Sequence, residues 1–169
     1  TRLPLVRGLG DVYKRQVAGF EAAREKYGTW ERERLIAPAL RLAQEGFVLE
    51  PGDIASLADG NDMLAQDPAA AAIFLKDGEP LRLGDRLVQH DLAGSLEAVS
   101  QGGADAFYKG EIADLIVQAS QANGGILAKP DFEEYRVREL EPVECSYRGY
   151  DIVSSPPPSS GGLIICCLL

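Results

Sequence analysis

The sequence has few of the residues that form disulfide frameworks and metal sites. Its 169 residues include three cysteines and one histidine. Cys166 and Cys167 are neighbours, Cys145 is the only other cysteine, and together with His90 they lack the spacing of a zinc site. Because free cysteine is among the most buried residue types, we expect buried free thiols, no disulfide framework and no structural metal.

The sequence also lacks an excess of basic residues and a long apolar run. Lysine and arginine number 17 against 26 acidic residues, and the net charge of −9 argues against a nucleic-acid partner because it repels phosphate backbones. The longest apolar stretch, Leu163 to Leu169, is far shorter than the roughly 18 residues that a membrane span needs. With 46% apolar and 25% charged residues, the composition is that of an ordinary globular domain.

Residues 1–16 have a basic bias opposite to that of the rest of the chain. The basic residues are Arg2, Arg7, Lys14 and Arg15, and the only acid is Asp11. The segment lacks the apolar region and cleavage site of a signal peptide, so we do not interpret it as a targeting segment. It resembles translated sequencing-adapter text, and we interpret it as a non-native, adapter-derived segment. This interpretation would be contradicted if the first three apolar side chains of the segment were buried in the same core as two side chains that follow it. The first three are Leu3, Leu5 and Val6, and the two that follow are Phe20 and Leu40.

The apolar spacing after this segment is mostly helical. We expect Gly28 to end a first helix in a left-handed conformation. Thr29 is expected to cap a second helix, which Gly46 ends. Pro38 lies inside this second helix and removes a backbone donor, so we predict a kink or break near Leu35.

Further helices are expected along the middle of the chain. Asp53 can cap a third helix, and Asp67 with Pro68 can start a fourth. Residues 76–80 combine Asp-Gly with proline and predict a turn or small hairpin. Two amphipathic helices follow, separated by a Gly-Gly break at residues 102–103. Their apolar positions are Val88, Leu92, Leu96 and Val99, then Tyr108, Ile112, Leu115, Ile116 and Ala119.

The C-terminal third is rich in β-forming residues and predicts short strands. These residues are Tyr135, Val137, Val143, Tyr147, Tyr150, Ile152 and Val153. Residues 156–158, all proline, interrupt the last strand and favour an extended, polyproline-like loop. Ser159 to Gly162 then open a buried aliphatic helix.

A few positions could carry nucleophilic or acid–base chemistry, but each also has a structural explanation. Thr1 could attack with its own amine as base, yet it lies in the segment interpreted as non-native. Ser159 and Ser160 adjoin paired glycines without matching G-x-S-x-G, so we expect helix capping. His90 is expected at the surface, in the first turn of a helix.

Carboxylates cluster in two runs that could supply an acid and a base. They are Asp131, Glu133 and Glu134, then Glu139, Glu141 and Glu144. Such runs usually form a solvated face. We therefore assign no catalytic, cofactor-binding or metal-binding residue to this chain, and we expect no cofactor.

Several short motifs follow one another along the chain in a characteristic order. They are Val17-Ala18-Gly19-Phe20, Lys26-Tyr27-Gly28-Thr29, Ala37-Pro38-Ala39, Leu42-Ala43, Gly46-Phe47, Gly84-Asp85, Gln89, Asp91-Leu92-Ala93, Phe107-Tyr108-Lys109-Gly110, Asn123-Gly124-Gly125, Tyr147-Arg148-Gly149-Tyr150, and Pro156 to Gly162. In this order they resemble the middle of the large subunit of the γ-glutamyltransferase (glutathione hydrolase) family. No single motif is diagnostic, and the resemblance rests on their succession.

The resemblance implies an α+β fold, in which the chain is a mostly helical fragment of an N-terminal-nucleophile hydrolase αββα sandwich with short strands in the C-terminal third. Residues 17–169 would be a partial large-subunit domain, truncated at both ends. In this family a precursor cleaves itself, and the threonine that it exposes attacks a γ-glutamyl amide to form an acyl-enzyme. That threonine lies downstream of this sequence, and the arginine that binds the substrate α-carboxylate lies upstream.

The implied partners are the small subunit of the same precursor and, for the parent enzyme, γ-glutamyl substrates such as glutathione. The chain itself would be an inactive scaffold, and the family suggests a periplasmic or extracellular location. The Ser-Ser-Gly-Gly run at residues 159–162 only looks like the family's small-subunit serine and glycine pairs. The basic start and Cys166–Cys167 depart from the family pattern, and we interpret the carboxyl end as a second foreign segment.

Two alternatives remain beside this interpretation. A related acylase of the cephalosporin acylase type shares the same superfamily. A non-catalytic helical interaction module would instead unfold cooperatively as an isolated chain. A large-subunit fragment would be unstable alone, because the apolar faces of Leu35, Leu96 and Ile116 would be partly unpartnered.

Overall fold

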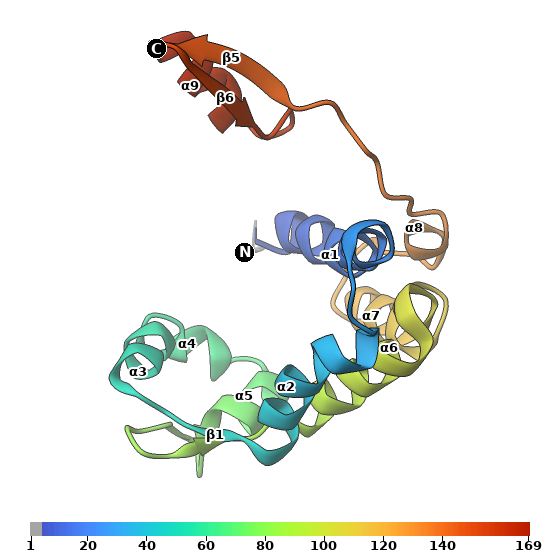
Figure 1. Cartoon of the computed structure of the whole chain (residues 1–169). Helices are drawn as coiled ribbons and strands as arrows, with labels where there is room; N and C mark the ends of the chain where they lie inside the picture. Colours follow the sequence, from blue (N-terminus) through green and yellow to red (C-terminus); the bar gives the residue numbers. More distant parts are fainter. Residues whose placement is uncertain (1–4) are drawn as a thin grey trace. The chain divides into compact units, whose positions relative to one another are not determined.

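The computed structural model describes residues 5–169, with side chains from residue 16 onward (Figure 1). It divides into two compact units, one ending at Tyr135 and the other running from Arg136 to Leu169. No helix among the described residues is long and apolar enough to cross a membrane.

The first unit is mostly helical, with two small antiparallel pairs of strands. Its elements are α1 Leu5–Tyr27, α2 Arg32–Glu45, β1 Phe47–Val48, α3 Pro51–Ala58, α4 Asn61–Leu64, α5 Pro68–Phe74, β2 Leu75–Lys76, β3 Glu79–Pro80, β4 Arg86–Leu87, α6 His90–Tyr108, α7 Glu111–Ala122 and α8 Pro130–Glu133. Strand β1 pairs with β4, and β2 pairs with β3. Strands are therefore not confined to the C-terminal third. Strands β2 and β3 correspond to the turn or small hairpin predicted at residues 76–80, whereas the sequence does not predict β1 and β4.

The core of this unit lies where α6, α7 and α8 meet. Tyr108, Ala113 and Phe132 are buried together there. Rings stack around them, with the Tyr108 and Tyr135 centroids 5.6 Å apart. The backbone N–H of Ala18 in α1 donates to the Tyr108 hydroxyl at 3.2 Å, which gives the buried phenol a polar partner.

Several helix ends lie where the sequence predicts them. Asp67 caps α5 by accepting from the N–H groups of Ala69 and Ala70, with Pro68 as the first helical residue. Gly46 ends α2 with a φ of 73°. The predicted hairpin joins β2 to β3, and both residues of its turn, Asp77 and Gly78, have positive φ.

Other helix ends correct the sequence expectations. The N-cap of α2 is Glu31 rather than Thr29. The N-cap of α3 is Glu50, whose N–H donates to the Asp53 carboxylate at 2.8 Å, so Asp53 is the third residue of a capping box. Gly28 follows α1, but its φ is not positive. A Cβ at this position would lie 2.5 Å from the Arg24 carbonyl oxygen, so close approach explains the glycine.

We predict a kink or a break near Leu35; helix α2 continues through Pro38 from Arg32 to Glu45, so there is no break. The predicted break at Gly102–Gly103 is present as a kink, because Gly103 has φ 63° and ψ −148° within α6. Helix α6 resumes after the kink and ends at Tyr108, so the next helix begins only at Glu111.

Helix α1 begins at Leu5 and continues through residue 16, where the composition changes. Thr1 and Leu3 lie outside the described residues, and so do the side chains of Leu5 and Val6. The burial test for residues 1–16 therefore falls outside the described part. Phe20 is 71% exposed.

The second unit is a β-hairpin with one helix. It consists of β5 Val143–Tyr147, β6 Tyr150–Ser154 and α9 Gly161–Leu168. The strands pair antiparallel from Val143 opposite Ser154 to Tyr147 opposite Tyr150. The predicted strands are present from Val143 onward, but Tyr135 and Val137 lie outside any strand.

The end of the second unit differs from expectation in two respects. Pro157 and Pro158 form a turn rather than an extended loop, with the Ser159 N–H donating to the Pro156 carbonyl at 3.1 Å. Helix α9 starts after Ser160 as predicted, but it is not a buried helix, because Gly162 is its only buried residue.

The cysteines also differ from expectation. Cys145 in β5 and Cys166 in α9 form a disulfide, with Cα atoms 5.9 Å apart, and Cys167 is free and exposed. The expectation of buried free thiols is therefore wrong. The pairing depends on how α9 lies against the hairpin, which the spacing of cysteines along the sequence does not encode.

Candidate functional surfaces

The residues singled out from the sequence lie in different parts of the chain, and each is described within its own unit. His90 is the exposed first residue of α6, as expected, and belongs to the first unit. Ser160 belongs to the second unit, where it is the N-cap of α9 without a side-chain hydrogen bond. Thr1 lies outside the described residues. Within neither described unit do these candidates include both a nucleophile and a base, because His90 lies in the first unit and Ser160 in the second.

The acidic runs are solvated, as the sequence predicts. All six of their carboxylates are exposed; they are Asp131, Glu133, Glu134, Glu139, Glu141 and Glu144. Asp131 accepts from the Ala128 N–H at 2.9 Å, which is a capping contact at the start of α8. Among residues 16–169, whose side chains the structure describes, no three histidine, cysteine, aspartate or glutamate side chains lie where they could hold a metal ion.

The strongest electrostatic feature is a cluster of Glu21, Arg24 and Arg32. Arg24 Nη2 lies 2.8 Å from Glu21 Oε1. Arg32 Nε lies 3.0 Å from both Glu21 carboxylate oxygens, and Arg32 Nη2 makes a further short contact with Oε1. Hydrogen bonds from Arg32 and then Arg24 lower the pKa of Glu21 to about 2.

This cluster joins three helices. Glu21 is in α1, Arg32 begins α2, and Arg32 Nη1 also donates to the Ser100 carbonyl of α6 at 3.4 Å. The backbone of Gly103 passes so close that a Cβ there would lie 2.8 Å from Arg32 Nη2. Because every charge has a partner and the groups pack against backbone, the cluster is built to hold helices together rather than to bind a ligand.

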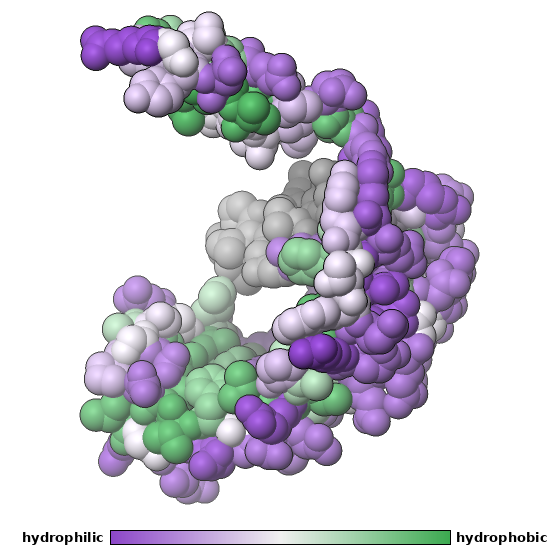
Figure 2. All heavy atoms as spheres, viewed as in Figure 1, coloured by the Kyte–Doolittle hydropathy of each residue, from purple (hydrophilic) through white to green (hydrophobic). Residues whose placement is uncertain are grey.

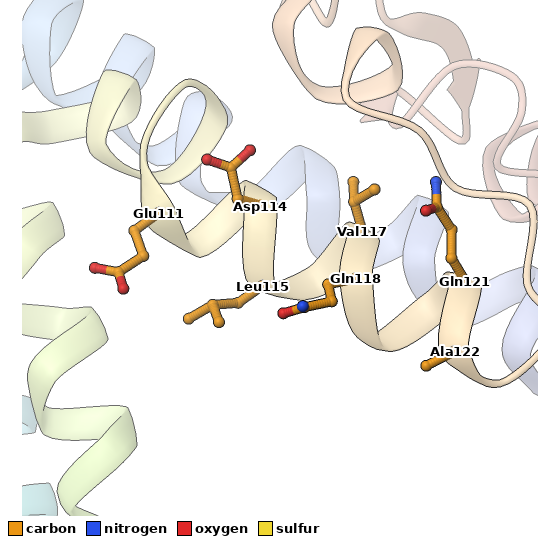
Figure 3. A pocket seen from close by; sticks show the side chains of 7 residues that line it. All are labelled: Glu111, Asp114, Leu115, Val117, Gln118, Gln121 and Ala122. Carbon is orange, nitrogen blue, oxygen red and sulfur yellow. The ribbon is translucent and has the colours of Figure 1, made fainter.

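A shallow depression lies along helix α7 (Figure 3). It is lined by Glu111, Asp114, Leu115, Val117, Gln118, Gln121 and Ala122. Asp114 is paired with Lys129 Nζ at 2.6 Å, and the lining has neither a nucleophile nor a cation of its own. Leu115, which lines the depression, is exposed. We therefore interpret the depression as part of the apolar surface and not as a reaction site.

Apolar side chains reach the surface at several places in the first unit. Figure 2 shows such residues over the segment that contains α3 to α5. Leu35 is 48% exposed, as expected for an unpartnered face, whereas Leu96 is half-buried and Ile116 packs against the core. The expectation of an exposed patch therefore holds for Leu35 and only in part for Leu96 and Ile116.

Comparison with known proteins defines the class of this mostly helical structure. The crystal structure of Helicobacter pylori γ-glutamyltranspeptidase matches 88% of this chain and 43% of its own, with a TM-score of 0.85 and 39% identity. The structure is thus a portion of an N-terminal-nucleophile hydrolase fold. Residues 16–169 match the gamma-glutamyltranspeptidase family, and the chain belongs to that family.

Two curated relatives show how much of such a protein the chain represents. It is 53% identical over 141 residues to the glutathione hydrolase proenzyme of Pseudomonas sp. (strain A14), covering 83% of this chain and 24% of the relative. It is 40% identical over 138 residues to the acylase ACY 1 proenzyme of Pseudomonas sp. (strain SE83), covering 82% of this chain and 25% of the relative. The chain spans about a quarter of the length of these relatives.

Proposed function

We propose that the parent protein is a γ-glutamyltransferase or glutathione hydrolase that cleaves γ-glutamyl amides through an acyl-enzyme. The observation that carries this proposal is the 53% identity to a glutathione hydrolase proenzyme, together with family membership from residue 16 to residue 169. The nucleophile would be a threonine exposed by self-cleavage of the precursor, on sequence outside this chain.

In this proposal the present chain is large-subunit scaffold. Its threonines are Thr1 and Thr29, and Thr29 lies in the loop between α1 and α2. The charged groups Glu21 and Arg32, which hydrogen-bond each other, are used to join helices. The remaining partner is the small subunit of the same precursor, whose strands would cover apolar surface such as that around Leu35.

We also propose that residues 1–16 are not part of the native domain, which would then comprise residues 17–169. The composition change near residue 16 and the start of the family match at the same position support this division. Removing residues 1–16 should leave the Ala18–Tyr108 hydrogen bond and the core around Ala113 intact, as amide exchange in α6 and α7 would measure. Loss of protection in both helices would contradict the division.

The scaffold proposal is tested by assaying the isolated chain with a chromogenic γ-glutamyl anilide. We expect no turnover above the buffer rate. Turnover by the isolated chain that disappears in Ser160→Ala would overturn the scaffold role. An equal trace rate in the two proteins would identify a contaminating enzyme.

A related acylase is the second candidate, favoured by the 40% identity to acylase ACY 1. The two activities differ in their need for a cation, because a γ-glutamyl group carries an α-carboxylate that a guanidinium binds in a bidentate manner. The full precursor should therefore be assayed with a γ-glutamyl anilide and with a cephalosporin whose acyl side chain carries no carboxylate. Preference for the cephalosporin would favour the acylase.

A further inference from the structure

Helix α6 changes its packing partner along its length. Its first part lies antiparallel to α2, because the N–H of Gln89 donates to the Ala43 carbonyl at 3.0 Å and the start of α2, at Arg32, lies beside Ser100. Helix α2 therefore accompanies α6 only up to the neighbourhood of Gly103, where α6 bends.

The last turn of α6 contacts α1 and the core. The N–H of Ala18 in α1 donates to the Tyr108 hydroxyl at 3.2 Å, and Tyr108 is buried with Ala113 and Phe132. The kink at Gly103 lies between this turn and the part of α6 that follows α2. The bend thus coincides with the change of partner.

The backbone at the kink is far from helical. Gly103 has φ 63° and ψ −148°, close to a region that only glycine adopts with ease. Such a residue interrupts the hydrogen-bond ladder of a helix, so the conformation persists only where surrounding contacts favour it over the helical one. The contacts at Gly103 therefore indicate what keeps α6 bent.

The guanidinium group of Arg32 lies directly against this backbone. Arg32 Nη1 donates to the Ser100 carbonyl at 3.4 Å, and a Cβ at Gly103 would lie 2.8 Å from Nη2 and 2.9 Å from Cζ. In an unbroken α-helix that carbonyl accepts from the N–H four residues further on. A side chain that competes for such a carbonyl is a known cause of helix kinks.

Helix α1 fixes the position of this guanidinium. Both carboxylate oxygens of Glu21 lie 3.0 Å from Arg32 Nε. Glu21 and Ala18 are three residues apart and share one face of α1. This face therefore acts on α6 at two places, at the kink through Arg32 and beyond it through Tyr108.

We propose that α1 holds α6 in its bent form, because Glu21 keeps the Arg32 guanidinium against the kink while Ala18 holds the turn beyond it. Without these contacts α6 would continue as a regular helix through Gly103. Arg32 is a positioning residue, and Glu21 acts on α6 through it. The docking of α1 and the direction of the last turn of α6 are thus coupled. This inference concerns the first unit alone and does not depend on the proposed enzymatic activity.

The coupling is tested by combining substitutions at Glu21 and Gly103 in the 169-residue chain and measuring amide exchange in α6. With Glu21 present, Gly103→Ala should speed this exchange by about 5- to 150-fold, because the new Cβ meets both a positive φ and the guanidinium. In Glu21→Gln the helical conformation becomes accessible at residue 103, and alanine favours it over glycine. There, Gly103→Ala should speed exchange by less than about 2-fold, or slow it.

Two variants serve as matched controls for this cycle. Glu25→Gln alters an exposed carboxylate on the same helix, so Gly103→Ala should have the same effect in it as in the wild type, within about 2-fold. Gly94→Ala lies in open space in α6 and should act equally with and without Glu21. If the effect of Gly103→Ala in Glu21→Gln stays within about 2-fold of its wild-type effect, α6 is bent without the help of α1 and the proposal is overturned.

A second measurement reports on Gly103 itself and requires no substitution there. The amide–amide nuclear Overhauser effect between Gly103 and Ala104 is strong in a helix and weak at a ψ of −148°. We expect a weak effect in the wild type and a strong one in Arg32→Met, which removes the guanidinium and keeps an apolar stem. A weak effect in Arg32→Met, with the Ala113 amide still protected, would contradict the proposal. The same comparison in Glu21→Gln decides the question if Arg32→Met does not fold.

Discussion

The Glu21 carboxylate is expected to contribute strongly to the local stability of the first unit. Its pKa falls from an ordinary 4.5 to about 2 because Arg32 and Arg24 donate hydrogen bonds to it. Since one pKa unit is worth about 1.4 kcal/mol, this shift corresponds to about 3 kcal/mol as an upper bound. The Glu21 and Arg32 side chains are 14% and 22% exposed, so partial screening reduces the expected value to about 2 kcal/mol.

The sign of the pH dependence follows from the lowered pKa. The folded state holds the Glu21 proton less tightly than the unfolded state does, so the contribution is fully present above pH 4.5 and is lost as the pH falls toward 2. Trp30 is the only tryptophan and lies between α1 and α2, so its fluorescence reports on this junction. We expect a fluorescence transition between pH 5 and pH 2 in the wild type.

The perturbation that tests this reasoning is Glu21→Gln. It removes the charge and leaves Arg32 without its carboxylate partner, so amide exchange in α2 should speed up by about 30-fold at neutral pH. Glu25→Gln is the matched control on the same helix, because Glu25 is 65% exposed and lies 3.6 Å from Arg24. It should change exchange by less than about 2-fold. Equal effects of the two substitutions, or a carboxyl pKa of Glu21 near 4.5 by NMR titration, would refute the reasoning.

Three further substitutions, two of them with a control variant, test the local geometry of the first unit. Gly103→Ala should destabilise α6 by about 1–3 kcal/mol, because Gly103 has a positive φ and crowded surroundings. Gly94→Ala in the same helix is the control: a Cβ there meets open space, so the change should be neutral or stabilising by up to about 1 kcal/mol. Amide exchange in α6 distinguishes the two variants. Tyr108→Phe leaves the Ala18 N–H without its partner and should cost about 1–2 kcal/mol, seen as faster exchange at that amide. Asp67→Ala should cost about 1 kcal/mol and expose the first turn of α5, whereas Asp67→Asn should retain most of the protection. Protection that is unchanged in Gly103→Ala, Tyr108→Phe or Asp67→Ala would contradict the corresponding contact.

The parts of the fold that sequence reasoning predicts are those fixed by neighbouring residues. The cap at Asp67, the helix end at Gly46 and the turn at residues 76–80 each depend on the conformations of a few adjacent residues, and all are present. The N-cap at Glu31 was missed because Thr29 has the better capping side chain, yet the helix starts where Arg32 reaches Glu21. Tertiary pairing thus outweighs local preference.

The features that sequence reasoning missed depend on contacts between distant residues. Glu21 and Arg24 are visible as a pair three residues apart, but nothing in the sequence places Arg32 and the Ser100 carbonyl beside them. The Cys145–Cys166 bond likewise requires α9 to lie against the hairpin. The prediction that this chain carries no catalytic residue, by contrast, rests on the family resemblance, which implies that the chemistry lies on other parts of the precursor.

The central claim is that this chain is scaffold from a self-cleaving precursor whose nucleophile lies elsewhere. The most direct measurement is to recover the contiguous coding DNA, express the whole precursor and sequence the amino terminus of each product. We expect a new amino-terminal threonine that lies beyond Leu169 in the precursor, together with γ-glutamyl anilide hydrolysis that is lost when that threonine is replaced. A start codon directly before Thr1 with a stop codon directly after Leu169, or a cleavage that exposes a residue within this chain, would contradict the account.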